Sequence, residues 1–350
     1  MTPPTSVKLS GKVRYAGVNI AGFDFGCLQD GSCPVKSCTE FVKTFPQRSH
    51  SLTFCSPGEE GAYQMQHFVK KQGLNTFRLP VAWQYLVNAK LGGELDSINF
   101  AKYDKLVQSC LQVAELCIIS IHNYGRWNGS VIGQSSGVVT NADFNSLWSQ
   151  LATKYANEPK VAFGLMNEPH KLCITDWAET IQDAVTTIRK TGAMQNLILL
   201  PGINHSSAGA FLYDGSATEL STVVNLDKST KNLIFDVHIY LDKDGTGKHS
   251  ECTTSNALVF TRLATWLRKE GRQAFLSETG GGNTNSCVKY MREQLQVLMN
   301  NSDVYLGWTG WAAGKFSTSY VLSETPFGKA GNYVDQLLVK EAIAGVFNSV

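Results

Sequence analysis

Short apolar runs rich in β-branched residues alternate along the chain with longer segments whose apolar residues recur every three to four positions. The short runs predict buried strands, and the longer periodicity predicts amphipathic helices. Eight strands are predicted in this way, in the runs that begin at Val13, Asn75, Leu116, Val161, Leu197, Leu233, Gln273 and Val304. Strands that alternate with helices are typical of a parallel sheet, so we expect an α/β fold.

The helices predicted between these strands have clear amphipathic patterns in all but one place. They span residues 61–72, 99–116, 141–156, 174–190, 256–270 and 286–299, whereas the segment after Gly209 has only a weak helical pattern. Eight strands in a chain of this length favour a closed (β/α)8 TIM barrel over an open doubly wound sheet. No G-x-G-x-x-G follows the first strand, which disfavours a dinucleotide-binding fold.

We predict a single domain over residues 13–350 and an N-terminal tail over residues 1–12. The tail contains the stretch MTPPTS, which we interpret as an initiator Met joined to the remnant of a Thr/Pro-rich linker. No stretch approaches the roughly 18 consecutive apolar residues of a membrane helix. A basic segment followed by an apolar one, as in a signal peptide, does not occur at the N-terminus either.

Composition narrows the classes of partner. The chain has 350 residues, of which 43% are hydrophobic and 17% are charged, so it can bury a large core. Its 31 basic and 29 acidic residues give a net charge of +2 and form no long runs. Nucleic acid and anionic membranes are therefore disfavoured as partners, and we expect a neutral substrate and a monomeric protein.

The nine cysteines form no C-x-x-C pair and have no zinc-like spacing to a histidine. We interpret them as disulfide partners in an oxidising compartment, which predicts a secreted, extracellular protein with disulfide-stapled surface loops. Three N-x-S/T triplets agree with secretion, at Asn128, Asn204 and Asn300. The expected pairs are Cys27 with Cys33, Cys38 with Cys55, Cys110 with Cys117 and Cys252 with Cys287, which leaves Cys173 free.

Polar side chains stand at the carboxyl ends of most predicted strands, where an α/β barrel builds its active site. Any one of them could be a satisfied polar residue, but strand ends from six strands would converge on one mouth. These residues are Arg78 on the second strand, His122 and Asn123 on the third, Asn167 and Glu168 on the fourth, His238 and Tyr240 on the sixth, Glu278 on the seventh and Trp311 on the eighth.

Glu168 and Glu278 are predicted to face each other across the barrel. Hydrolysis of a glycosidic bond needs two carboxyl groups, and a separation of about 5 to 5.5 Å gives retention of configuration whereas a wider gap gives inversion. Arg78 and Tyr240 are expected to hold Glu278 ionised, so Glu278 should have the lower pKa. His238 is expected to orient Glu168, and Asn167 to bind a substrate hydroxyl.

The sequence resembles family 5 glycoside hydrolases, and within them fungal endoglucanases, from Gly17 to about Pro326. The segments that carry the resemblance are AGVNIAGFDFGC at Ala16, FRLPVAWQYLV at Phe77, IHNYGRWNG at Ile121, FGLMNEPH at Phe163, NLIFDVHIYLD at Asn232, LSETGGGN at Leu276 and DVYLGWTGWAAG at Asp303. The resemblance implies a retaining cellulase that acts on internal β-1,4-glucosidic bonds, with Glu168 as acid/base and Glu278 as nucleophile. It implies no cofactor.

Three features depart from the family pattern. After the fifth strand this chain has GINHSSAGAF, and His205 stands where similar proteins carry a Trp, which could alter a leaving-group subsite. Trp308 is an additional aromatic beside Trp311, and because strand residues alternate faces we expect it in the core. The segment from Pro34 to Cys55 is long and is expected to form a stapled surface loop.

Other functions remain open at this point. The segment GQSSG at 133–137 matches the nucleophile pattern of serine hydrolases, but no helix begins at its serine. A metal hydrolase is disfavoured because the seven histidines lack H-x-H or H-E-x-x-H spacing, and we predict no metal ligands. A catalytically inactive sugar-binding barrel is a third possibility.

The choice between β-glucan, mannan and xyloglucan is also open, because nothing in the spacing of the catalytic residues separates these substrates. Aromatic side chains are the candidates for sugar contacts, since sugars stack on aromatic faces. Tyr124, Trp127, Tyr240 and Trp311 are expected in the groove, whereas Trp83 and Trp148 are expected in the core.

Overall fold

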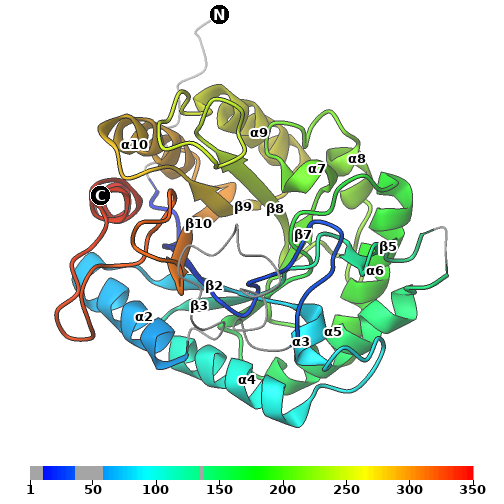
Figure 1. Cartoon of the computed structure of the whole chain (residues 1–350). Coiled ribbons are helices and arrows are strands. Elements are labelled where there is room, and N and C mark those ends of the chain that lie inside the picture. Colours follow the sequence, from blue (N-terminus) through cyan, green and yellow to red (C-terminus); the bar gives the residue numbers. More distant parts are fainter. Residues whose placement is uncertain (1–10, 36–57, 135–136, 350) are drawn as a thin grey trace, which may run out of the picture.

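The computed structural model describes residues 11–35, 58–134 and 137–349. Within them, eight parallel strands close into a barrel that is surrounded by helices (Figure 1). The predicted (β/α)8 TIM barrel is confirmed. The strands are β1 (Tyr15–Ala21), β2 (Thr76–Val81), β3 (Leu116–Ile121), β6 (Val161–Gly164), β7 (Ile198–Pro201), β8 (Leu233–Tyr240), β9 (Ala274–Gly280) and β10 (Tyr305–Gly314).

Neighbouring strands of the barrel follow the chain order, and β10 closes the ring by pairing with β1. The eight predicted runs coincide with these eight strands. A short hairpin that the sequence pattern did not predict, β4 (Arg126–Trp127) with β5 (Ser130–Val131), lies in the segment between β3 and the following helix. It is too short to produce a recognisable alternation of apolar and polar residues.

The longer helices match the predicted segments closely. They are α2 (Gly58–Gln72), α4 (Ser97–Leu111), α5 (Asn141–Tyr155), α6 (Ile174–Lys190), α9 (Ala257–Glu270) and α10 (Asn285–Met299). The prediction for α4 ran too far, because residues 112–115 form the connection to β3. Shorter elements are α3 (Trp83–Leu86), α7 (Ile203–Ser206), the weakly predicted α8 (Ser216–Leu220), the π-helix η2 (Val339–Ile343) and α11 (Ala344–Phe347).

Local sequence signals fix several helix ends. Thr140 and Asp143 form a reciprocal capping box at the start of α5, and Asp96 accepts hydrogen bonds from the first turn of α4. At the other end of α9, Gly271 adopts a left-handed conformation with φ 63°, which a glycine adopts at no steric cost. These caps explain why the predicted and observed boundaries agree there within two residues.

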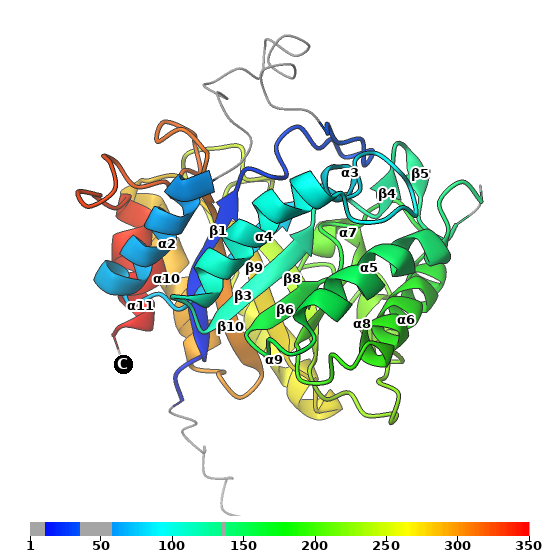
Figure 2. The same cartoon turned by 90° about the horizontal axis from the view of Figure 1, so that it is seen from below.

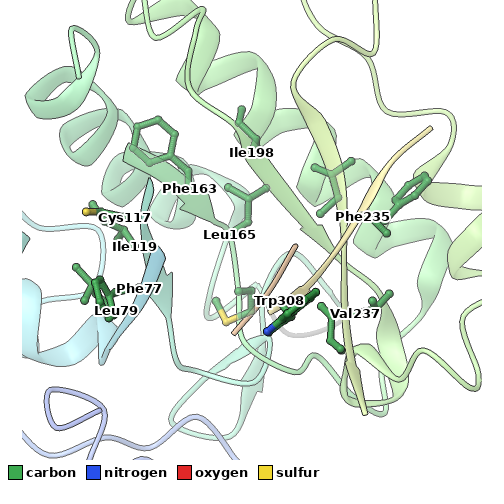
Figure 3. Packing of buried hydrophobic residues seen from close by; sticks show 14 of the residues in the cluster. Phe77, Leu79, Cys117, Ile119, Phe163, Leu165, Ile198, Phe235, Val237 and Trp308 are labelled. Carbon is green, nitrogen blue, oxygen red and sulfur yellow. The ribbon is translucent and has the colours of Figure 1, made fainter. Parts of the chain in front are cut away.

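Two apolar layers build the core. The outer layer lies between the strands and the helices, and Figure 3 shows Phe77 and Leu79 of β2 and Ile119 of β3 in it. Figure 2 shows α4 along the outside of this part of the barrel, where it packs against β2 and β3. A second cluster combines alternate strand residues such as Ile118 and Phe275. Because successive strand residues point to opposite faces, this second cluster fills the barrel interior.

The alternation also explains which side chains reach the site. Arg78 lies between Phe77 and Leu79, so it points to the interior face that they avoid. Trp308, by contrast, belongs to the outer layer, where Figure 3 shows it among other buried side chains. Its ring packs edge-on against Phe347 of α11, with the ring centroids 6.1 Å apart. The prediction that Trp308 lies in the core is confirmed.

Three predicted disulfides are present among the described residues: Cys27–Cys33, Cys110–Cys117 and Cys252–Cys287. Cys173 is exposed and free, as predicted. The predicted pair Cys38–Cys55, most of the loop from Pro34 to Cys55 and the tail stretch MTPPTS lie outside the described residues, as does the serine of GQSSG. None of the helices in the described ranges is long and apolar enough to cross a membrane.

Candidate active site

A cavity of about 1480 Å³ opens at the carboxyl ends of the barrel strands. It is lined by residues in the last part of β8, β9 and β10 and by residues that follow β1, β3, β6, β7, β8 and β10, so nearly the whole mouth of the barrel contributes. Among the predicted site residues, those lining it are His122, Asn167, Glu168, His238, Tyr240, Glu278 and Trp311. The cavity exceeds the roughly 300 to 1,000 Å³ of a typical small-molecule pocket, as a site for several sugar units requires.

Glu278, near the end of β9, is held by two donors on its two oxygens. Arg78 Nη1 lies 2.9 Å from Oε2, and the Tyr240 hydroxyl donates to Oε1 at 2.5 Å. The Glu278 side chain is 6% exposed. Both hydrogen bonds favour the ionised carboxylate and fix its orientation.

Glu168 follows β6 and has a left-handed backbone with φ 46°. His238 Nδ1 donates to its Oε1 at 3.1 Å, and His205 Nδ1 lies 3.4 Å from its Oε2. The Glu168 side chain is 16% exposed, so it is the more accessible of the two carboxylates. Carboxylate oxygens of Glu168 and Glu278 approach within 4.8 Å of each other.

Arg78 connects Glu278 with two asparagine side chains. Its Nη1 also donates to Asn19 at 2.9 Å, and its Nη2 donates to the Asn167 side-chain oxygen at 2.7 Å. The parallel register pairs Asn19 of β1 with Arg78 of β2, which brings these side chains together. Asn167 thus uses its oxygen on Arg78, and its Nδ2 has no protein acceptor among the described residues.

His238 lies between the two carboxylates because the register of β8 and β9 pairs it with Glu278. Its Nε2 contacts the Ser277 hydroxyl at 2.9 Å, and its Nδ1 is 3.9 Å from Glu278 Oε2. Burial would lower the pKa of His238, but the negative charge of Glu278 and the hydrogen bond to Glu168 raise it above its ordinary value. His238 therefore carries a proton beside Glu168 at mildly acidic pH.

Aromatic rings form one wall of the cavity. The His122 ring stacks on Trp311 at 5.4 Å with an interplanar angle of 14°, and Tyr124 meets His122 edge-on. Burial lowers the pKa of His122 well below its ordinary value, so its ring is neutral. Phe316 and Tyr320 extend the aromatic surface from the segment after β10. Flat apolar faces flanked by hydrogen-bonding groups suit the faces and hydroxyls of sugars.

Different neighbours act on the pKa values of the two glutamates. Burial raises the pKa of Glu278 above its ordinary value, although His238, Arg78 and Tyr240 oppose this shift. Burial would also raise the pKa of Glu168, but its polar contacts with His205 and His238 outweigh burial and lower it. Because Glu168 and Glu278 both interact with His238, the three groups titrate together, and the expectation that Glu278 has the lower pKa stays a prediction.

Three predicted residues do not line the cavity: Arg78, which reaches Glu278 from β2, and Asn123 and Trp127. Asn123 is fully buried, and its amide bonds to the backbone N–H of Trp83, the side chain of Gln84 and the carbonyl of Gly31. Trp127 is 5% exposed and packs edge-on against Trp83 at 4.9 Å, so it belongs to the core. Asn123 and Trp127 support the loops around the mouth. Trp83 and Trp148 are fully buried, as predicted.

Sequence reasoning missed Asp24, which lines the cavity after β1. Burial raises the pKa of Asp24 to about 7, although the backbone N–H of Gly22 donates to it at 2.7 Å. Its position after the first strand could have drawn attention, since no polar residue was assigned to that strand end. Asn19 and Ser277 also contact site residues, but sequence reasoning did not single them out.

Two groups of side chains within the described residues bring carboxylate and imidazole atoms within 4.8 Å of one another, as metal ligands would. One is Glu168, His238 and Glu278, and the other is Asp242, Asp244 and His249. In the first, the carboxylate oxygens already accept hydrogen bonds from protein donors. In the second, Asp242 accepts bonds from three backbone N–H groups of its own loop and from His249. We assign no metal to either group.

Two carboxylates less than 5 Å apart, held by arginine, tyrosine and histidine in the mouth of a (β/α)8 barrel, define a glycoside hydrolase. Comparison with known families agrees, since the sequence model described as "Cellulase (glycosyl hydrolase family 5)" matches residues 38–314. The chain belongs to glycosyl hydrolase family 5.

Individual relatives extend this result. The chain is 56% identical to Endoglucanase EG-II of Hypocrea jecorina over 336 residues, which are 96% of this chain and 78% of that protein. The crystal structure of Cel5A (EG2) from Hypocrea jecorina superposes with a TM-score of 0.87 at 54% identity and covers 96% of this chain and 99% of that one. XacCel5A in complex with cellopentaose gives a TM-score of 0.79 at 30% identity, over 95% and 99% of the two chains.

Proposed function

We propose that Glu278 as nucleophile and Glu168 as acid/base hydrolyse internal β-1,4-glucosidic bonds of cellulose and related β-glucans with retention of configuration. The observation that carries this proposal is the approach of the two carboxylates to within 4.8 Å. Retaining enzymes have carboxyl groups about 5 to 5.5 Å apart, whereas inverting enzymes need about 6.5 to 9.5 Å to admit a water molecule between acid and base. The double-displacement mechanism follows from the short separation.

In the first step a Glu278 oxygen attacks the anomeric carbon, the glycosidic C–O bond breaks, and the leaving oxygen takes a proton from Glu168. Arg78 and Tyr240 aim the Glu278 carboxylate and keep it ionised until it attacks. In the second step Glu168, now a carboxylate, removes a proton from water, and the resulting hydroxide replaces Glu278 at the same carbon. Two inversions give net retention.

Glu168 needs a proton for the first step although its pKa is lowered in the free site. His238 is the neighbour that stores this proton, because its pKa is raised and its Nδ1 lies 3.1 Å from Glu168 Oε1. Transfer of one proton from His238 Nδ1 to Glu168 Oε1 converts the pair of imidazolium and carboxylate into a neutral imidazole and a neutral carboxylic acid. Glu168 and His238 therefore titrate as a coupled pair, and the acid function belongs to the pair.

The substrate assignment rests on the cavity and on the relatives. A large cavity with Trp311 and Tyr124 in its walls suits a chain of neutral sugars. The most similar relatives reported above are endoglucanases, and XacCel5A binds cellopentaose in its structure. A mannan or xyloglucan substrate is the alternative. A side-by-side assay decides between them, with carboxymethyl cellulose, mixed-linkage β-glucan, mannan and xyloglucan as substrates. We expect higher activity on carboxymethyl cellulose and mixed-linkage β-glucan, which carry no sugar side chains.

Secretion, a monomeric state and the division into a tail over residues 1–12 and a catalytic barrel over 13–350 are parts of the same proposal. Three disulfides support an oxidising environment, since such bonds are rare in reducing compartments. Light scattering at micromolar concentration tests the monomer directly.

Product anomericity tests the mechanism. Proton NMR of the earliest products from a β-linked cello-oligosaccharide should show the β-anomer first, with the α-anomer appearing only through mutarotation. Initial release of the α-anomer would exclude double displacement. The absence of any reducing sugar from cellulose and from the other three polysaccharides would instead point to an inactive sugar-binding barrel.

A further inference from the structure

His205 contacts the segment of the acid/base residue in two places. Its ring Nδ1 lies 3.4 Å from Glu168 Oε2, and its backbone N–H donates to the carbonyl of Pro169, the next residue after Glu168, at 3.0 Å. Its side chain is 42% exposed and lines the cavity, so it lies between Glu168 and solvent. An ionised carboxylate only accepts hydrogen bonds, so the Nδ1 that faces it carries the hydrogen.

The His205 ring is held in place from its other side. It stacks on the His170 ring with centroids 4.5 Å apart and an interplanar angle of 14°. His170 is itself fixed by a hydrogen bond of 2.9 Å between its Nε2 and the carbonyl of Gln29, in the loop closed by Cys27–Cys33. Burial lowers the pKa of His170, so a neutral ring supports His205 and the two imidazoles can stack without charge repulsion.

The backbone around His205 is unusual and anchored. Asn204, His205 and Ser206 have φ values of 54°, 59° and 53°. Residues other than glycine rarely adopt this left-handed backbone conformation in succession. The Asn204 side chain donates to Asp214, and Ala208 N–H donates to the carbonyl of His238 on β8 at 2.9 Å. The turn after β7 is therefore tied to β8, and it presents the His205 ring to Glu168.

We propose that His205 is a positioning residue for Glu168 that sets the upper pH limit of the acid function. This proposal rests on the acid/base role proposed above for Glu168. The ring N–H of His205, 3.4 Å from Oε2, stabilises the ionised carboxylate electrostatically, so the Glu168–His238 pair loses its proton at lower pH than it would without His205. The same contact leaves the carboxylate ready to act as base in the second step.

The charged and titratable groups around His205 come from several elements. Glu168 and His170 contact the His205 ring itself, and the groups that contact or act on the neighbours of His205 are Lys171, Tyr124 and Arg126 around His170, Asp214 at Asn204, His238 at Glu168 and Glu278 at His238. Glu168 is the acid in direct polar contact with the His205 ring. Replacing His205 therefore acts first on Glu168.

The test compares pH profiles of kcat/KM for two variants. His205→Phe keeps an aromatic ring for the stack on His170 but cannot donate to Glu168, and its alkaline limb on a cello-oligosaccharide should move up by about 0.5 to 1 pH unit. His205→Asn tolerates the left-handed backbone and can still donate, so its limb should stay near that of the parent. His249→Asn removes a comparably exposed histidine that contacts Asp242, and serves as matched control with an unchanged limb.

A substrate with a good leaving group separates a positioning role from a general loss of structure. On a dinitrophenyl β-cellobioside the first step needs no acid, so the alkaline limb of kcat/KM should be the same in the parent and in His205→Phe. A shift on both substrates, an unshifted limb in His205→Phe, or an equal shift in His205→Asn and His205→Phe would overturn the inference. Failure of the proposed role of Glu168 is seen separately, as full cellulose hydrolysis by Glu168→Gln.

Discussion

The hydroxyl of Tyr240 donates a hydrogen bond of 2.5 Å to Oε1 of Glu278, on the side of the carboxylate opposite Arg78. Tyr240 ends β8 and Glu278 lies near the end of β9, so the contact depends on the pairing of these two strands. The proximity of Glu278 raises the pKa of the buried Tyr240 hydroxyl further above its ordinary value than burial alone. The phenol therefore remains a donor throughout the working pH range.

Tyr240→Phe removes this donor and keeps the ring. Tyr240 lowers the pKa of Glu278, so its loss should raise that pKa and move the acidic limb of kcat/KM to higher pH, by about 1 unit. The sign follows because the nucleophile must be ionised and will ionise only at higher pH. We expect kcat/KM to fall by about 10- to 100-fold at the optimum.

Steady-state pH profiles of Tyr240→Phe on a soluble cello-oligosaccharide check this expectation. Tyr213→Phe is the matched control, because Tyr213 is 72% exposed and does not line the cavity. An acidic limb that stays in place in Tyr240→Phe would mean that Arg78 and His238 keep Glu278 ionised without Tyr240.

The Cys252–Cys287 bond gives a prediction about stability. It joins the loop after β8 to the first turn of α10 across a sequence separation of 35 residues. On the chain-entropy estimate such a link contributes about 4 kcal/mol by restricting the unfolded chain. The double variant Cys252→Ser/Cys287→Ser should therefore show a clearly lower melting temperature, whereas Cys173→Ser, which changes the free cysteine, should not. Equal melting temperatures for the two variants would contradict the estimate.

Much of the fold could be predicted because the barrel repeats one simple pattern. Each strand is a short run buried on both faces, and each long helix shows an apolar stripe, so strands such as β2 and helices such as α6 are recognisable individually. The hairpin β4–β5 and the turn α7 could not be predicted. They are set by loop contacts and by left-handed residues such as His205, which leave no periodic pattern in the sequence.

The candidate site was predictable to the extent that it follows from strand ends. Position alone identified Glu168 and Glu278, since parallel strands in a barrel end at one mouth. Position could not reveal all the polar contacts of Glu168, because one of them comes from His205, a residue from a different loop 37 positions away in sequence. For Asn123 the position in the sequence was misleading. Asn123 follows β3, as a residue of the site would, but hydrogen bonds with Trp83 and Gln84 satisfy its amide inside the protein.

The last prediction separates the roles of the two glutamates. Attack on the anomeric carbon requires Glu278 for every substrate, so Glu278→Gln should be inactive on cellulose and on aryl β-cellobiosides alike. Its melting temperature, measured beside the activity, checks that the variant is folded. Glu168→Gln should lose cellulose hydrolysis, because a sugar alkoxide cannot leave without a proton, yet it should still release a good aryl leaving group.

In Glu168→Gln the glycosyl-enzyme should accumulate, because water then lacks its general base. A burst of phenol followed by slow turnover is the expected time course in a stopped-flow or quenched assay. Added azide needs no base to attack, so it should speed the slow phase and form a β-glycosyl azide, whose anomeric proton is identifiable by NMR. The opposite result, a burst from Glu278→Gln and an inactive Glu168→Gln on aryl cellobiosides, would exchange the two roles, with Glu168 attacking and Glu278 donating the proton.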